Sequence, residues 1–253
     1  MAHDKAVPSE TTLHQDERAL RTEIVRVCRL MHERGLIAAT DGNVSTRLGE
    51  EHLLTTPTGV PKGLLREEDL VITDLQGQVV PGGAHDGARP SAELRLHLEA
   101  YRLRPDVVAV VHAHPPMTTA LTVAGVSLAP CVIPETLVNL GTIATTAYAT
   151  PTSEQGPQVI RALIGTHDAL ALDRHGAVTV GQSPMDAYGK MEKVENTAVV
   201  LAAARALGQV KILPLDEIRR LVAMRREHLG LSAEAAAPDC ARCGACPGFR
   251  WND

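Results

Sequence analysis

The sequence is poor in aromatic residues and contains no long hydrophobic run. Phe, Trp and Tyr make up 2% of its 253 residues, which argues against the stacking platforms that bind single-stranded nucleic acid. No segment approaches the roughly 18 consecutive apolar residues that a membrane-spanning helix needs, and the polar segment 1–12 has no signal-peptide core. Positive charge is not in excess either, since 25 Lys and Arg face 30 Asp and Glu and give a net charge of −5. We therefore expect neither nucleic acid nor a membrane as a partner.

Cysteine is scarce outside the C-terminal segment. Three of the five cysteines, Cys240, Cys243 and Cys246, lie within 231–253. This distribution differs from that of a disulfide-stapled secreted domain, so a reducing, cytoplasmic location is expected. Three close cysteines are compatible with a zinc or iron–sulfur site that takes His228 as an outlying fourth ligand. The favoured interpretation is a tail with no fixed role.

The rest of the composition is that of a globular protein. Hydrophobic residues make up 44% and charged residues 22% of the chain, both of which are ordinary values. A chain of this length can bury a substantial core as one large domain. We expect a loose N-terminal tail over 1–15, a single domain over 16–230 and the Cys-containing tail over 231–253.

Helical and strand-like segments alternate along the domain. Spacing of apolar residues predicts helices over 16–34, 157–164, 184–207 and 215–229, and two more that start near Ser91, as N-cap, and near Pro115. Apolar or β-branched runs predict strands over 44–48, 52–55, 70–74, 78–80, 107–111, 169–173 and 178–181, and segment 126–149 has further strand-like pieces. Several connections are too short for crossovers. The expected fold is therefore α/β with a mainly antiparallel, mixed sheet.

Two histidines follow the most apolar predicted strand. His112 and His114 stand at positions i and i+2, so both imidazoles point to the same side if the strand continues through them. A catalytic zinc site needs three protein ligands and an open position. The best third candidate is His175, which follows another apolar strand and precedes Gly176. His-x-His alone is a weak signal, because such pairs also occur away from metals.

A carboxylate and two polar turns complete the candidate site. Glu93 follows Ser91 at a predicted helix start, where it could ligate a cation or act as a general base, or simply cap the helix. Segments 41–45 and 56–60 are turns rich in hydroxyl, amide and glycine, which can present N–H groups to an anion or be ordinary turns. Neither turn matches a known nucleotide-binding loop.

The order of these pieces resembles the class II aldolase/adducin family, which is typified by L-fuculose-phosphate aldolase. The motifs that carry the resemblance span about 16–229 and are Gly42-Asn43-Val44-Ser45, Thr56-Pro57-Thr58-Gly59, Pro90-Ser91-Ala92-Glu93, His112-Ala113-His114 and His175-Gly176. Each is weak alone, and their common order makes them specific. The resemblance implies an α/β/α sandwich around a mainly antiparallel sheet. It also implies a cyclic homotetramer with active sites at subunit interfaces.

The resemblance also implies roles for individual residues. His112, His114 and His175 would ligate Zn²⁺, with Mn²⁺ or Fe²⁺ as alternatives, and Glu93 would be the acid/base beside the metal. The phosphate pocket would comprise Asn43, Thr58, Gly59, Ser91 and Ala92. Relatives usually have a second serine at position 92, so Ala92 offers only its backbone N–H.

The implied reaction is the cleavage of a phosphorylated sugar. An aldolase would split an L-fuculose-1-phosphate-like ketose into dihydroxyacetone phosphate and a short aldehyde through a metal-stabilised enediolate. Glu135 is a second candidate acid/base, because methylthioribulose-1-phosphate dehydratase-like members have a glutamate in this region. Dehydration, decarboxylation of an oxo-tetronate phosphate and a non-catalytic, adducin-like scaffold are the alternatives. The expectation is the aldolase.

Overall fold

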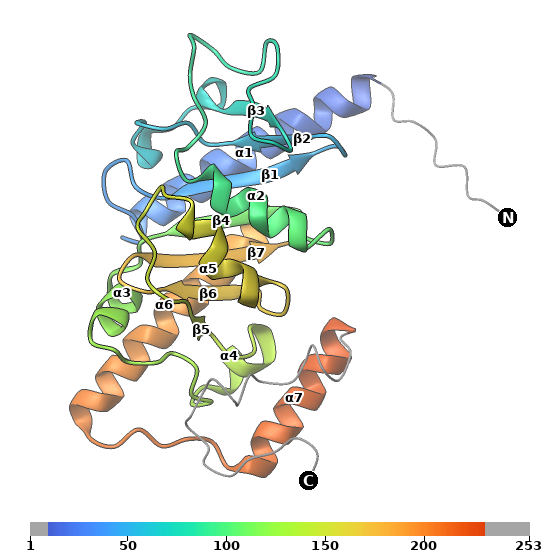
Figure 1. Ribbon diagram of the computed structural model, residues 1–253. Coiled ribbons are helices and arrows are strands. Elements are labelled where there is room, and N and C mark those ends of the chain that lie inside the picture. The colour runs from blue at the N-terminus through green and yellow to red at the C-terminus, as the bar shows by residue number, and fades with distance from the viewer. Residues whose placement is uncertain (1–9, 231–253) are drawn as a thin grey trace, which may run out of the picture.

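The computed structural model describes residues 10–230, which form a series of helices joined by the strands of one sheet (Figure 1). The Cys-containing tail over 231–253, which we expect to have no fixed role, lies outside the described residues. The elements are α1 (Glu10–Glu33), β1 (Asn43–Leu48), β2 (His52–Thr55), η1 (Lys62–Leu64), η2 (Glu67–Asp69), β3 (Val71–Asp74), α2 (Leu94–Leu103), β4 (Ala109–Ala113), α3 (Pro116–Val123), α4 (Pro134–Asn139), β5 (Ala144–Thr145), α5 (Gln155–Ile164), β6 (Ala169–Leu172), β7 (Gly176–Gly181), α6 (Pro184–Leu207) and α7 (Leu215–Leu229).

The strands form one seven-stranded sheet in the order β3-β2-β1-β4-β7-β6-β5, which runs from top to bottom in Figure 1. Every neighbouring pair is antiparallel except β5 and β6, which are parallel. The predicted mixed and mainly antiparallel sheet is confirmed. The strand that carries the histidine pair, β4, lies at the centre of the sheet.

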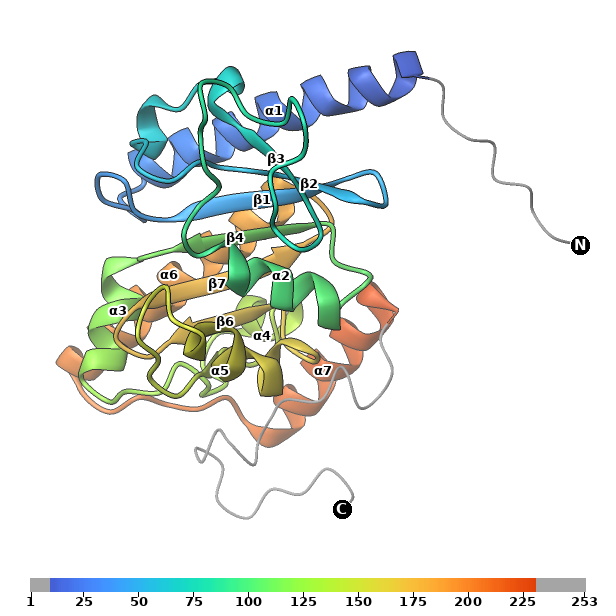
Figure 2. The same ribbon diagram turned by 45° about the horizontal axis from the view of Figure 1, so that its top comes forward.

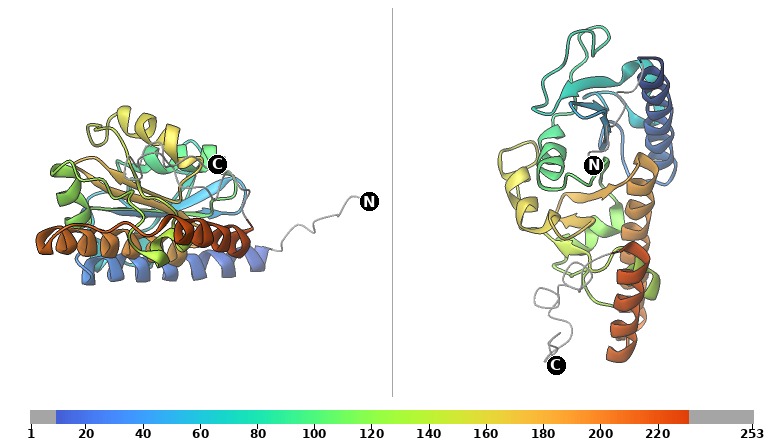
Figure 3. Two further views of the ribbon diagram at one scale, coloured as in Figure 1. Left: turned by 90° about the horizontal axis from the view of Figure 1, so that it is seen from below. Right: turned by 90° about the vertical axis from the view of Figure 1, so that its right-hand side faces the viewer.

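Helices cover both faces of the sheet, as the edge-on views in Figure 3 show. Helices α1, α6 and α7 lie on one side, and α2 and α5 lie on the other. Alternate residues of β4 pack accordingly: Val111 belongs to the core cluster that contains α1 and α6, and Val110 to the cluster that contains α2 and α5. Because strand side chains alternate between faces, each face of β4 has its own core. The three-layer α/β/α prediction is confirmed.

The expected helix at Ser91 begins three residues later than predicted. Helix α2 starts at Leu94 with Glu93 as its N-cap residue, so the prediction of Ser91 as N-cap was wrong. The Ser91 backbone N–H donates to the Thr56 carbonyl at 3.1 Å, and Pro57 bridges Pro90. In Figure 2 the segment that joins β3 to α2 crosses in front of β2 and β1 before the helix begins. Residues 92 and 93 form a turn, in which the Ser91 hydroxyl accepts the Glu93 N–H at 3.3 Å, and the helix begins after this turn.

Other boundaries also differ from the expected ones. The predicted strand over 78–80 is only an isolated bridge between Thr73 and Val79, and α4 falls in segment 126–149, which was predicted to contain strand-like pieces. Helix α1 starts at Glu10 rather than near residue 16. The sequence did not predict its first turns, because they contain no apolar residues at helical spacing. None of the helices within 10–230 is long and apolar enough to cross a membrane.

We predict that Gly176 controls the pairing of β7 with β4. A Cβ atom on Gly176 would overlap the carbonyl oxygen of Ala113 in the neighbouring strand. Gly176→Ala should therefore lower the free energy of unfolding by about 1–3 kcal/mol, the usual range for overpacking in a core. Urea unfolding followed by circular dichroism measures this change.

Gly189→Ala in α6 is the matched control. A Cβ atom there meets nothing within 4 Å, apart from the backbone of its own helix. Alanine is the better helix former, so this variant should gain about 0.5–1 kcal/mol. Equal unfolding midpoints for the Gly176 variant and the natural protein would show that the strands tolerate a side chain at their junction.

Candidate metal centre

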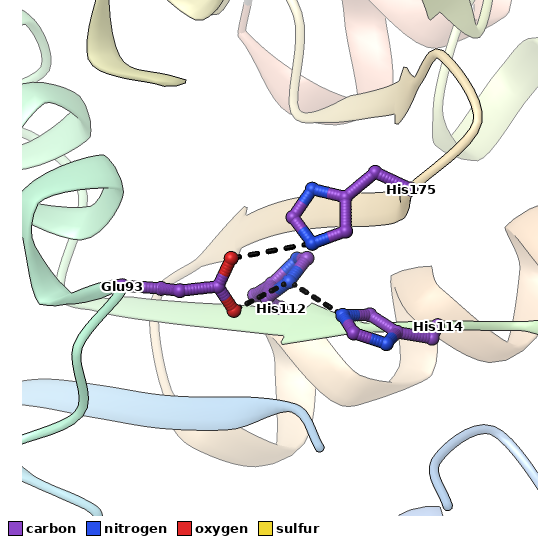
Figure 4. Close-up of side chains that lie close together, drawn as sticks. All are labelled: Glu93, His112, His114 and His175. Carbon is purple, nitrogen blue, oxygen red and sulfur yellow. Dashed lines mark hydrogen bonds and ion pairs between the residues drawn. The ribbon is translucent and has the colours of Figure 1, made fainter. Parts of the chain in front are cut away.

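Three histidines and one glutamate from separate segments converge on one point (Figure 4). His112 is in β4, His114 follows that strand, His175 lies in the turn between β6 and β7, and Glu93 precedes α2. Each residue offers one potential ligand atom, and these four atoms lie within 4.8 Å of one another. The predicted convergence of the three histidines with Glu93 is thus what the structure contains.

The carboxylate of Glu93 connects two of the rings. Its Oε2 lies 3.2 Å from His112 Nε2, and its Oε1 lies 3.2 Å from His175 Nε2. The Nε2 atoms of His112 and His114 are 3.1 Å apart. The three ring centroids are separated by 4.8–4.9 Å, so the rings surround a common centre.

The donor set fits a divalent cation. The Nδ1 atom of His112 lies 2.9 Å from the Ala177 carbonyl, to which it must donate its proton, so the Nε2 lone pair faces the cluster when the ring is neutral. His114 Nδ1 lies 3.4 Å from Asp41 Oδ2 and also leaves Nε2 on the cluster side. Two lone pairs that face each other repel unless a proton or a cation lies between them. Ligands about 2.1 Å from a tetrahedral zinc ion are about 3.4 Å apart, close to the separations here.

The electrostatics of the cluster prepare two of its ligands for a cation. Burial alone would raise the pKa of Glu93, but the charges and hydrogen bonds of His112 and His175 outweigh it and hold that pKa below its usual range. Burial, together with the charges of His112 and His175, lowers the pKa of His114 to about 4. Glu93 is therefore ionised and His114 neutral near pH 7, as metal binding requires. Burial opposes a charge on His112, but Glu93 outweighs it and raises the pKa of that ring, so a cation that binds must displace a proton from His112.

The sheet and its adjoining loops fix the positions of these ligands. The Leu36 carbonyl accepts a hydrogen bond from the His114 N–H at 3.0 Å. Helix α3, which begins two residues later, is capped by the Glu195 carboxylate, which accepts the N–H groups of Met117 and Thr118 at 2.9 Å each. Sequence reasoning missed Asp41 and Glu195 as supports of His114. Only the position of Asp41 before Gly42 in a predicted turn could have indicated the first.

The residues of the expected phosphate pocket are also brought together. Asn43 lies opposite His112 in the pairing of β1 with β4, and its Nδ2 donates to Glu93 Oε2 at 3.3 Å. Its Oδ1 is buried without a hydrogen-bond partner. The Thr58 N–H donates to the Arg89 carbonyl at 3.0 Å, which joins the turn of Thr58 and Gly59 to the segment of Ser91 and Ala92. All five residues thus belong to adjoining segments beside Glu93.

An open hollow lies next to Glu93 and His175. Its other walls come mainly from segment 146–153 and from α5. Alanine, proline, leucine and valine supply about half of the lining residues, and threonines, Ser153, Asp173 and Arg95 add polar groups. A small molecule bound at the cluster has room on this side for a short, partly apolar group.

Glu135 lies away from the four-residue cluster. It is exposed on α4, which packs against α7 and α6. Within the described residues of one chain, Glu135 is therefore not part of the cluster of Glu93 and the three histidines. Arg174, which precedes His175, pairs with Asp173 at 3.0 Å.

We predict that His114→Ala abolishes tight binding of one divalent cation per chain. The variant removes one of the convergent nitrogens, so affinity should fall at least about 100-fold. The side chain is a quarter exposed, so the metal-free protein should keep its melting temperature. Competition with a chromophoric chelator measures the affinity.

His85→Ala is the control, because the His85 side chain is exposed and lies outside the cluster. It should bind the cation like the natural protein. Unchanged affinity in the His114 variant would show that the cluster is not the metal site.

Comparison with known proteins agrees with this geometry. A sequence model of the Class II Aldolase and Adducin N-terminal domain matches residues 22–202. An L-fuculose phosphate aldolase of Methanococcus maripaludis is 34% identical over 177 residues, which are 70% of this chain and 93% of that protein. A 3-oxo-tetronate 4-phosphate decarboxylase of Pectobacterium atrosepticum is 31% identical over 219 residues, which are 84% of this chain and 96% of that protein.

The fold has relatives among solved structures as well. The crystal structure of an L-fuculose-1-phosphate aldolase from Thermus thermophilus is 30% identical in sequence and superposes with a TM-score of 0.64. The match covers 77% of this chain and 98% of that one. The match of the family model to most of the chain, together with relatives above 30% identity, shows that this chain belongs to the class II aldolase and adducin family.

Proposed function

We propose that this protein is a metal-dependent lyase that cleaves a ketose 1-phosphate resembling L-fuculose 1-phosphate into dihydroxyacetone phosphate and a short aldehyde. The observation that carries the proposal is the convergence of three imidazoles and Glu93 beside a set of polar turns. Three nitrogens and one carboxylate suit Zn²⁺, and Mn²⁺ and Fe²⁺ also accept them. The 34% identity to an aldolase supports this activity over the others.

A divalent cation held by His112, His114 and His175 would polarise the ketose carbonyl and stabilise the negative charge that develops on its oxygen. Glu93 is the group placed to move a proton. In the direction of cleavage it would take a proton from water and deliver it to the carbon of the three-carbon fragment after the carbon–carbon bond breaks. In the direction of condensation it removes that proton, which its ionised state allows.

The two ends of the substrate would lie on opposite sides of Glu93. Backbone N–H groups and hydroxyls of Thr58, Gly59, Ser91 and Ala92, with the Asn43 side chain, would bind the phosphate. The aldehyde end would occupy the hollow beside His175, whose partly apolar lining suits a fragment of a few carbons. This arrangement places the bond to be broken near the carboxylate.

We further propose a homotetramer in which subunits complete each other's sites. Glu135 is exposed on α4 and apart from its own cluster, so a catalytic role for it requires a neighbouring subunit. There it would exchange a proton with the oxygen of the departing aldehyde. Sedimentation should show an oligomer at micromolar concentration.

A decarboxylase is the second candidate. The 31% identity to 3-oxo-tetronate 4-phosphate decarboxylase over 84% of the chain favours it. Loss of carbon dioxide from a 3-oxo acid leaves the same kind of enolate, so the cluster would serve either reaction. Methylthioribulose-1-phosphate dehydratase activity, which Glu135 suggests, and an adducin-like scaffold are further alternatives.

A substrate screen separates these functions. The zinc-loaded protein is incubated with a panel of ketose 1-phosphates and with 3-oxo-tetronate 4-phosphates. Release of dihydroxyacetone phosphate from a ketose 1-phosphate supports the aldolase. Release of carbon dioxide identifies the decarboxylase, and loss of water identifies the dehydratase. Either result without release of dihydroxyacetone phosphate contradicts the proposal. A metal-loaded protein inert toward the whole panel favours the scaffold.

We predict that Glu93→Gln lowers turnover by about 10²–10⁴-fold, the usual contribution of a general acid–base group. The amide keeps the size and the hydrogen-bonding oxygen of the side chain, so cation and phosphate binding should persist. Steady-state kinetics and metal analysis measure the two effects. A variant with near-normal turnover would exclude Glu93 as the proton-transfer group.

We predict that Glu135→Gln slows turnover but leaves proton exchange on bound dihydroxyacetone phosphate intact. Exchange requires only the group beside the cation, whereas cleavage also requires proton transfer at the leaving oxygen. NMR in deuterated water follows the exchange. Loss of exchange in this variant and its survival in the Glu93 variant would reverse the two roles and favour the dehydratase.

A further inference from the structure

The ammonium group of Lys62 is buried next to the candidate phosphate pocket. The residue is 2% exposed, which is rare for a lysine. Its Nζ donates to the carbonyl of Thr40 at 3.0 Å and to the carbonyl of Val60 at 2.9 Å. Its hydrogen-bond acceptors are thus backbone oxygens rather than a carboxylate, and its positive charge is not neutralised by a salt bridge.

The two carbonyls belong to the two turns that flank the pocket. Thr40 precedes the turn that leads to Asn43, and Val60 follows Thr58 and Gly59. The Thr56 N–H donates to the Val44 carbonyl at 3.0 Å, so the turns are also linked at the base of β1. One ammonium group therefore joins the two turns beyond the point where the paired strands β1 and β2 end.

The local fold fixes where Lys62 enters. Lys62 begins η1, which lies against α1, and a Cβ atom on Gly63 would come within 2.6 Å of the His32 ring. The glycine thus lets η1 approach α1 closely. Burial disfavours the charged ammonium and lowers its pKa. The nearby Cys28 and Asp41 offset part of this effect of burial.

We infer that Lys62 is a positioning residue for phosphate recognition: its ammonium holds the turn before Asn43 and the turn of Thr58 and Gly59 in register. The inference rests on the proposed function, because it assigns the same pocket to phosphate. It differs from the direct contacts, since Lys62 reaches the substrate only through the two turns. A positioning residue of this kind changes affinity for the phosphate end more than the proton transfer at Glu93.

The test compares Lys62→Met with the matched control Lys190→Met. Lys190 is also largely buried and donates to a backbone carbonyl, that of Val180 at 2.9 Å, but it pairs with Asp168 on the far side of β7. Lys62→Met loses an ammonium and two carbonyl hydrogen bonds, and Lys190→Met loses an ammonium, one carbonyl hydrogen bond and an ion pair. A general loss of stability should therefore appear in both, and a loss of phosphate affinity only in the first.

The measurement is the binding of inorganic phosphate to each zinc-loaded protein by calorimetry, with zinc content and melting temperature recorded alongside. Lys62→Met should bind phosphate about tenfold or more weakly, because the two turns lose the group that joins them. Zinc content should be unchanged, and KM for a ketose 1-phosphate should rise more than kcat falls. Lys62→Gln keeps a hydrogen-bond donor but not the charge, so its phosphate affinity should lie between those of Lys62→Met and the natural protein.

The outcomes separate the inference from the proposed function. A natural protein that holds zinc but binds no phosphate would overturn the proposed phosphate pocket itself. Normal phosphate binding in Lys62→Met, with binding intact in the natural protein, would overturn only the role of Lys62. If Lys62→Met does not fold, Lys62→Gln decides the question. Lys62→Gln that binds phosphate as tightly as Lys190→Met would also contradict the inference.

Discussion

The close antiparallel contact between β4 and β7 is the constraint on which the rest of the site depends. Gly176 lies against the backbone of Ala113, so the end of β4 and the turn after β6 meet with no side chain between them. His175 directly precedes that contact, and its ring lies 4.8 Å from the rings of His112 and His114. If β4 and β7 were farther apart at this point, His112 and His114 would remain together but His175 would lie away from them. The fold therefore assembles the metal centre through backbone proximity rather than through side-chain packing.

Strand pairing and hydrogen bonds connect the metal cluster to the turns proposed for phosphate binding. Asn43 in β1 is paired with His112 in the neighbouring strand β4 and also donates to Glu93. Strand β1 therefore connects the metal cluster to the phosphate turns. The turn before Asn43 carries Asp41 beside His114 and Thr40 above Lys62. Asp41 and Glu93 thus lie beside the histidines, and Lys62 holds the adjoining turns that are proposed for the phosphate.

The sequence predicted the residues of the cluster because their signals are local or come from motif order. His112 and His114 share a strand, and the common order of the motifs pointed to His175 and Glu93. The start of α2, the helix α4 and the supports Asp41, Glu195 and Lys62 depend on contacts between segments far apart in the chain. Ser91 shows the difference: its hydroxyl accepts the Glu93 N–H as a local signal predicts, but α2 begins only after Glu93, in a segment that Ser91 also joins to Thr56. Long-range pairing of this kind leaves no periodic signal in a single sequence.

Zinc K-edge X-ray absorption on the full chain loaded with one equivalent of Zn²⁺ tests the central claim most directly, that the histidine cluster is the metal centre. The account predicts a shell of nitrogen and oxygen atoms at about 2.0–2.1 Å with the outer-shell scattering of imidazole rings. A shell dominated by sulfur at about 2.3 Å would contradict it, because the cation would then be bound by cysteine thiolates instead.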